Sequence, residues 1–208
     1  MAFLLLAFVV GVVVAVPPTG PINLLFYRWL IDRQFRLASV HLLSVVASDV
    51  FYAGLAVFGY AWLLGAYPEV SVGIQILGLL LVTGIGLRYL LAPPQVELQE
   101  GEEAGSLGAE VAQGLGVALL NPSNLLTWLI ALDILHTLGA VDADLALWEQ
   151  IGFPLAAGLG SAAWFGGVML AWYRWVKRPS ARVARLAIRG IGALLLAVAV
   201  AYGWSAFG

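Results

Sequence analysis

The sequence predicts an all-α integral membrane protein with six transmembrane helices, arranged as two inverted three-helix repeats whose first and fourth helices are broken. Three observations lead to this prediction. The composition is too apolar for a protein in water, six long apolar segments follow one another, and a short proline-containing motif occurs once in each half.

The composition excludes an ordinary soluble domain. Of the 208 residues, 62% are hydrophobic and only 11% are charged. One core of a chain this short could not hide so much apolar surface from water, so the expected surroundings are lipid. The chain contains no cysteine, which excludes disulfides and thiol chemistry.

Each apolar segment is long enough to cross a bilayer, since a helical span needs about 20 apolar residues. The segments cover 2–30, 37–65, 70–91, 109–135, 150–174 and 187–206. They predict a single membrane domain over 1–208 without a separate soluble domain. Its first repeat would cover 1–91 and its second repeat 108–208, with residues 92–107 as an acidic cytoplasmic linker.

The basic residues predict the orientation. All ten Lys and Arg residues fall on one side of a six-span arrangement, in the first, third and fifth connections or close to them. The positive-inside rule therefore places these connections in the cytoplasm and both termini outside. The first segment lacks a basic start and continues past Pro17 and Pro21 into more apolar sequence, so we interpret it as a retained helix.

The two halves share an internal motif. The stretch VAVPPTGPINLLFYRWL in the first segment and VALLNPSNLLTWLIAL in the fourth both contain Pro-x-Asn-Leu-Leu, so Pro21 matches Pro122 and Asn23 matches Asn124. An odd number of crossings separates the two stretches, which gives the halves opposite orientations. Interrupted helices at corresponding positions of inverted repeats indicate a binding site at the membrane midplane.

The first break is expected to expose backbone carbonyl groups. Pro17, Pro18 and Pro21 lack backbone donors, and Gly20 permits backbone angles that other residues avoid, while Thr19 adds a hydroxyl. Unpaired carbonyls are costly in lipid, so this break should face the inside of the bundle.

The second break adds side-chain amides. This break contains Asn121, Pro122, Ser123 and Asn124. The side-chain amides of the two asparagines can bind a carboxylate, an ammonium group or a cation. The two breaks are therefore predicted to form one site. A pair of structural proline kinks is the alternative interpretation.

Asp49 lies near the middle of the second segment, where inserting an aspartate costs about 2.5–3.5 kcal/mol. It must be partnered or protonated. His41, Ser44, Ser48 and Tyr52 recur at helical spacing and form a polar stripe beside it. The stripe predicts a proton or cation path that uses Asp49. The alternative is a structural aspartate that ties the second helix to the broken first helix.

Other polar and small residues are given structural roles. Asp133 and His136 are predicted to lie in the interface at the outer end of the fourth segment. Two histidines without a carboxylate cluster do not predict a metal site. Four small residues on one helix face predict close packing within or between subunits. They are Ala156, Gly160, Ala163 and Gly167.

Three motifs carry a resemblance to a known family. The sequences PPTGPINLL, ASDVFYAG and NPSNLL resemble the lysine exporter (LysE/RhtB) translocator family over nearly the whole chain. The resemblance implies a small six-helix exporter of amino acids in the bacterial inner membrane, driven by the membrane gradient. Relatives in the wider superfamily export metal cations.

The family's motifs fall on particular residues of this chain. The resemblance places the Pro-Gly-Pro signature on Pro18, Gly20 and Pro21, the acidic second-helix position on Asp49, and the Asn-Pro signature on residues 121–122. Two departures mark a divergent branch. Thr19 stands between Pro18 and Gly20, and Ser123 stands where the family often has a lysine.

These observations predict a proton-coupled exporter of amino acids or similar small metabolites that alternates its access at the paired breaks. The predicted site comprises Pro18, Thr19, Gly20, Pro21, Asn23, Asp49, Tyr52, Asn121, Pro122, Ser123 and Asn124. No nucleophile with a base is apparent, so an enzyme is not expected. A metal-cation exporter that uses the oxygen atoms of the same site is the alternative.

The predicted partners are few. They are a small solute, a coupling proton or cation, and membrane lipid, with no cofactor and no nucleic acid. The resemblance and the stripe of small residues favour a homodimer.

Overall fold

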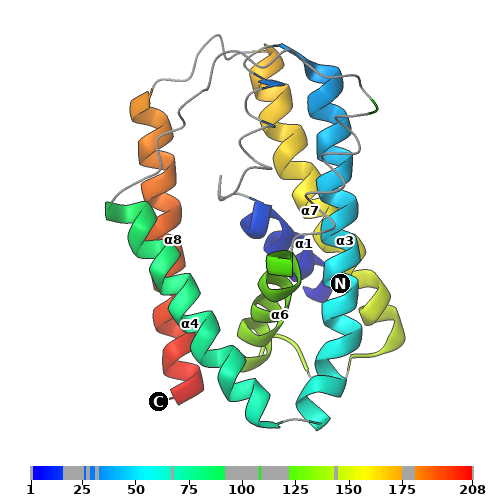
Figure 1. Cartoon of the computed structure of the whole chain (residues 1–208), viewed down its shortest axis with the longest axis vertical. Helices are drawn as coiled ribbons and strands as arrows, with labels where there is room; N and C mark the ends of the chain where they lie inside the picture. Colours follow the sequence, from blue (N-terminus) through cyan, green and yellow to red (C-terminus); the bar gives the residue numbers. More distant parts are fainter. Residues whose placement is uncertain are drawn as a thin grey trace.

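The computed structural model describes residues 2–15, 26, 29–30, 33–66, 68–91, 108, 122–142, 145–174 and 181–207. These residues form helices and connections and contain no β-strand, which confirms the predicted all-helical class. The helices are α1 (Ala2–Ala15), α3 (Phe35–Ala66), α4 (Pro68–Leu91), α6 (Pro122–Thr137), α7 (Leu147–Arg174) and α8 (Ala181–Phe207) (Figure 1).

Three of the described helices are long and apolar enough to cross a membrane. Their qualifying stretches are Phe35–Tyr60 in α3, Val72–Leu91 in α4 and Leu147–Arg174 in α7. The other three contain shorter apolar stretches. The predicted linker 92–107 and the predicted first break at 17–21 lie outside the described residues, so both remain predictions.

Local sequence signals set the described ends of α6 and α7. Pro122 is the first described residue of α6, and a proline suits the first turn of a helix, where its missing N–H costs no helical hydrogen bond. Gly139 follows the helix with φ 68° and donates its N–H to the His136 carbonyl, as in a Schellman ending. At the start of α7, the Glu149 carboxylate accepts the Ala146 N–H at 2.9 Å, which satisfies a donor that the helix leaves unpaired.

The helices form two groups with α6 between them. Helices α1, α3 and α7 pack together, α4 packs against α8, and α6 contacts α3, α4 and α8 (Figure 1). The two groups also touch directly, where α3 meets α4. Helices α1 and α7 are parallel, because Phe3 contacts Trp148 and Gly11 lies against Ala157. Helix α4 is antiparallel to α8, since Gly86 faces Gly192 while residues 78 and 79 face residues 202 and 203.

Glycine allows the closest helix contacts. A Cβ atom at Gly160 would meet the backbone of Phe8 and Val12, so α1 and α7 touch through their main chains. Within the chain, only part of the predicted small-residue stripe packs against another described helix. Ala163 and Gly167 are exposed, and nothing lies within 4 Å of the Cβ position of Gly167.

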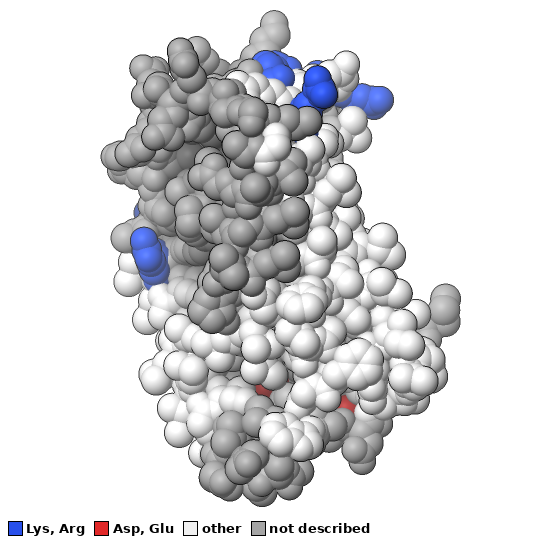
Figure 2. Space-filling view, turned by 45° about the vertical axis from the view of Figure 1, so that its right-hand side comes forward, with Lys and Arg blue, Asp and Glu red and all other residues white. Residues whose placement is uncertain are grey.

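The bundle has two chemically different ends. Phe35 contacts Tyr173 at the end that also carries Arg36 and Arg174, which we call the arginine end. The C-terminus lies near the opposite end, which we call the terminal end, and the described N-terminus lies in the same half of the bundle (Figure 1). In Figure 2 most of the visible Lys and Arg atoms gather at one end, one further group lies on a long side, and most of the described surface of the long sides is uncharged. Exposed leucine, valine and aromatic side chains on these sides suit contact with lipid.

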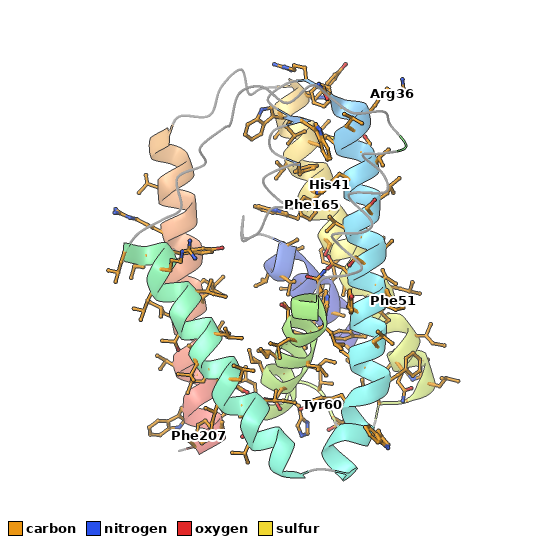
Figure 3. The ribbon with its side chains drawn as sticks, viewed as in Figure 1. Arg36, His41, Phe51, Tyr60, Phe165 and Phe207 are labelled. Carbon is orange, nitrogen blue, oxygen red and sulfur yellow. The ribbon has the colours of Figure 1, made fainter. Side chains whose placement is uncertain are left out.

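Two apolar clusters fill the core, one toward each end. The cluster toward the arginine end contains Ala15, Phe26, Trp29, Leu30, Ala38 and Phe165. The cluster toward the terminal end is larger and contains Ala7, Tyr52, Ala53, Ala56, Val57, Tyr60, Trp128, Leu132, Leu135, Val141, Phe153 and Ala157. Figure 3 shows Phe165 in the half near Arg36 and Tyr60 in the half near Phe207.

Candidate functional site

Asp49 is buried where α3 meets α6 and α7. Its carboxylate accepts a hydrogen bond from the Ser161 hydroxyl of α7 at 2.7 Å and another from the Trp128 side chain of α6. Only 8% of Asp49 is exposed. The cost of placing a carboxyl group at this depth is thus offset by hydrogen bonds from two neighbouring helices.

Ser161 also connects Asp49 to α1. Its Oγ lies 3.3 Å from the backbone carbonyl oxygen of Gly11, besides its contact with Asp49. A hydroxyl has one hydrogen to donate. An ionised Asp49 accepts the hydrogen bond from the Ser161 hydroxyl. A protonated Asp49 can instead donate to the Ser161 oxygen, which leaves the hydroxyl free to donate to the Gly11 carbonyl. The contacts of α1 can therefore change when Asp49 binds a proton.

The residue before Asp49 makes the matching contact with α6. Asn124 donates a hydrogen bond from Nδ2 to Ser48 Oγ at 3.2 Å, and Ser48 is buried. Two adjacent residues of α3 thus bind two other helices through polar groups. We call Gly11, Ser48, Asp49, Asn124, Trp128 and Ser161 the polar layer.

The polar layer lies between the two apolar clusters. Tyr52 and Val57 follow it along α3 toward the terminal end, and Ala38 precedes it toward the arginine end. The polar layer is therefore one of two levels at which buried side chains form hydrogen bonds between helices, and apolar side chains separate it from the second level around Asp133.

The structure places the predicted site residues as follows. Asp49 and Asn124 both belong to the polar layer, and Tyr52 lies one helical turn from Asp49 in the terminal-end cluster. Pro122 and Ser123 open α6, and their side chains are not described. The remaining predicted residues lie outside the described part of the chain. They are Pro18, Thr19, Gly20, Pro21, Asn23 and Asn121.

The rest of the predicted polar stripe is buried but does not join this layer through its described hydrogen bonds. Ser44 donates to the Val40 carbonyl of its own helix. His41 packs against Phe26 and Trp29, with ring centroids 6.2 and 5.0 Å away.

Two members of the polar layer were missed in the sequence. Ser161 and Trp128 look like ordinary residues of apolar helices. One signal pointed to Ser161, because the segment from Ser48 to Tyr52 resembles the segment from Ser161 to Phe165. That likeness places the two serines at matching positions of the halves.

The predicted interfacial role of Asp133 is wrong. Asp133 has no exposed surface, and it accepts a hydrogen bond from Tyr60 of α3 at 2.9 Å and another from Tyr202 of α8. Its position near the end of α6 suggested access to water, but α3 and α8 cover it. His136 also lies inward, with its ring 5.9 Å from that of Tyr60 and its Nδ1 3.2 Å from the Val141 carbonyl.

A metal site is not assembled by the part of the chain that the structure describes. No group of three or more His, Cys, Asp or Glu side chains comes together there. The described hydrogen-bond partners of the Asp49 carboxylate, the Ser161 hydroxyl and the Trp128 side chain, are neutral.

The comparison with known families decides the membership of the chain. The profile of the LysE type translocator family matches residues 12–204, which include the whole polar layer except Gly11. The chain belongs to the LysE type translocator family. It is thus a multi-pass membrane protein of a transporter family, as the sequence motifs indicated. Neither the curated proteins nor the solved structures contain a match.

Proposed function

We propose that this LysE type translocator is a secondary-active, proton-coupled exporter of amino acids or similar small metabolites. Access to the solute site would alternate around the polar layer and the two predicted helix breaks. The observation that carries the proposal is the buried Asp49 carboxyl group, which shares the Ser161 hydroxyl with α1.

The shared hydroxyl offers a route from proton binding to helix movement. When Asp49 is ionised, the Ser161 hydroxyl donates its hydrogen bond to Asp49 of α3. When Asp49 is protonated, the same hydroxyl can donate to the Gly11 carbonyl of α1. Helix α1 leads toward the predicted break at Pro17–Pro21. A proton on Asp49 would then change how firmly α1 is held next to the solute, which is the linkage that a coupled carrier requires.

The contacts of the two serines support the inverted repeat. Ser48 of α3, in the second predicted span, contacts α6 in the fourth, whereas Ser161 of α7, in the fifth span, contacts α1 in the first. Each half thus uses its second helix to hold the first helix of the other half. By the same symmetry, we expect Asn23 to face Ser161 as Asn124 faces Ser48.

The ends of the bundle support the proposed orientation. The arginine end would lie in the cytoplasm and both termini outside, in the bacterial inner membrane. We keep the homodimer as a prediction, since Ala163 and Gly167 leave an exposed strip of small residues on α7.

The decisive experiment is Asp49→Asn in proteoliposomes with an imposed pH gradient and a panel of amino acids. Asparagine keeps the shape and can still accept from Ser161, but it cannot exchange a proton. We expect gradient-driven transport to be lost while the variant inserts and elutes normally. Asp142→Asn, at an exposed acidic residue, is the matched control. Full transport by Asp49→Asn would remove Asp49 from the mechanism, and transport of metal ions in its place would favour the alternative cargo.

A further inference from the structure

A second buried carboxyl group lies outside the polar layer. Asp133 of α6 accepts the Tyr60 hydroxyl on Oδ1 and the Tyr202 hydroxyl on Oδ2, so each carboxylate oxygen has its own donor. The cluster lies toward the terminal end, where Figure 3 places Tyr60. The chain has no Lys or Arg between Arg36 and Arg88, between Arg88 and Arg174, or after Arg189. The hydroxyl groups therefore take the place that an ion pair would fill.

The two tyrosines come from different helix groups. Tyr60 belongs to α3, which packs with α1 and α7, whereas Tyr202 belongs to α8, which pairs with α4 (Figure 1). Asp133 thus connects the two groups through one carboxylate. Its attachment to α3 is reinforced, because Asn124 and Trp128 also bind α3 at Ser48 and Asp49. The hydrogen bond from Tyr202 is a polar contact between the described parts of α6 and α8.

The cluster lies on the way from the polar layer to the terminal end. Tyr60 follows Asp49 by 11 residues of α3, which is about 16 Å of helix at 1.5 Å per residue. Val57 and Leu132 fill the space between with apolar side chains. His136 packs against the Tyr60 ring and is itself fixed at the Val141 carbonyl, so Tyr60 is held in place.

We propose that Asp133 keeps the protein closed on its outer side, by holding the α4–α8 pair against α6 and α3 through the Tyr202 hydroxyl. We call the hydrogen bond between Tyr202 and Asp133 the clasp, and the contact between these two groups of helices at the terminal end the outer gate. This inference depends on the proposed function for the alternation of access. Outward opening separates α8 from α6 and breaks the contact between Tyr202 and Asp133, while Asp133 stays with Tyr60. In the closed state the clasp and the apolar cluster beneath it shield the polar layer from the outside.

The absence of cysteine provides a clean test. Val57→Cys places a thiol on α3 beneath the clasp, at a residue that is 4% exposed. In intact cells, a membrane-impermeant thiol reagent reports how often the gate opens to the outside. We expect Tyr202→Phe to speed labelling of this thiol by about tenfold or more, since it removes a hydrogen bond to a carboxylate and keeps the ring.

Two variants serve as comparisons for Tyr202→Phe. Tyr60→Phe should have a smaller effect, because other polar contacts keep α6 on α3. Tyr173→Phe makes the same chemical change at an exposed residue of the arginine end and should leave labelling unchanged. Equal labelling rates in Tyr202→Phe and in the parent would overturn the clasp. Labelling needs no solute, so failure of the proposed function would appear only in the Asp49→Asn transport assay.

A reversible cross-link tests the direction of opening. A Cβ atom at Gly78 of α4 would lie 3.1 Å from Cγ2 and 3.6 Å from Cγ1 of Ile130 of α6, so Gly78→Cys with Ile130→Cys brings two thiols into disulfide range. Oxidation should stop transport and a reductant should restore it. Gly86→Cys with Leu196→Cys joins α4 to α8 within their pair and should leave transport intact. Full transport by the oxidised Gly78–Ile130 variant would show that α4 and α8 do not move away from α6.

Discussion

At the scale of single residues, the proposed function depends on which oxygen atom accepts the hydrogen bond from the Ser161 hydroxyl. The Ser161 hydroxyl stands between the Asp49 carboxylate and the Gly11 carbonyl, and it cannot donate to both. The sequence predicted that Asp49 is buried and polar in its contacts, because a carboxyl group in the middle of an apolar span has no other stable state. It could not predict Ser161 as the partner, since 112 residues separate the two along the chain.

Ser161→Ala tests this shared hydrogen. The substitution leaves Asp49 and the Gly11 carbonyl without the hydroxyl, and we expect gradient-driven transport to fall strongly with a loss of about 1–3 kcal/mol in stability. Ser44→Ala is the control, because that buried hydroxyl bonds only within its own helix. Transport rates in proteoliposomes and thermal midpoints in detergent measure the two effects. Indistinguishable results for the two serines would show that Ser161 does not transmit the protonation of Asp49.

At the scale of the helices, small residues determine how closely neighbours approach. The sequence predicted a packing face through Ala156, Gly160, Ala163 and Gly167, and the structure uses only part of it. The backbone of α7 meets α1 at Gly160, whereas Gly167 lies in open space. Helical spacing shows which residues share a face, but it does not show where the neighbouring helix ends.

Gly160→Ala and Gly167→Ala form a matched pair. The added methyl at residue 160 would contact the Phe8 carbonyl and approach the Val12 nitrogen to 2.8 Å, which are backbone atoms that cannot move aside. In the monomer, we expect Gly160→Ala to lower the free energy of unfolding by about 1–3 kcal/mol or more, and Gly167→Ala to leave it unchanged or slightly raised. Thermal unfolding in detergent measures both. Equal midpoints would mean that α1 and α7 are not in main-chain contact.

At the scale of the whole molecule, charge separates the two ends. Arg36 and Arg174 lie at the arginine end, and both described termini lie in the opposite half of the bundle (Figure 1). The positive-inside rule then assigns the arginine end to the cytoplasm.

Single cysteines test this orientation without background. Phe207→Cys should react with an impermeant thiol reagent in intact cells, whereas Arg36→Cys should react only after the membrane is permeabilised. Both residues are exposed, and Figure 3 places them at opposite ends. The reverse pattern would turn the proposed exporter around in the membrane, and with it the outer gate.

The sequence by itself determined the all-helical class, the spans that became α3, α4 and α7, the buried position of Asp49 and the translocator family. These features follow from local composition, periodicity and short motifs, which a single segment can carry. Segment 37–65 thus predicted α3 to within two residues at each end.

Only the tertiary structure decided which polar groups meet. Ser161 and Trp128 join Asp49, and Tyr60 and Tyr202 cover Asp133, because helices far apart in the chain pack side by side. The physical reason is that a hydrogen bond depends on the distance between two atoms in space. The pattern within one helix fixes the face on which a residue lies, and the packing of the other helices decides what that face touches.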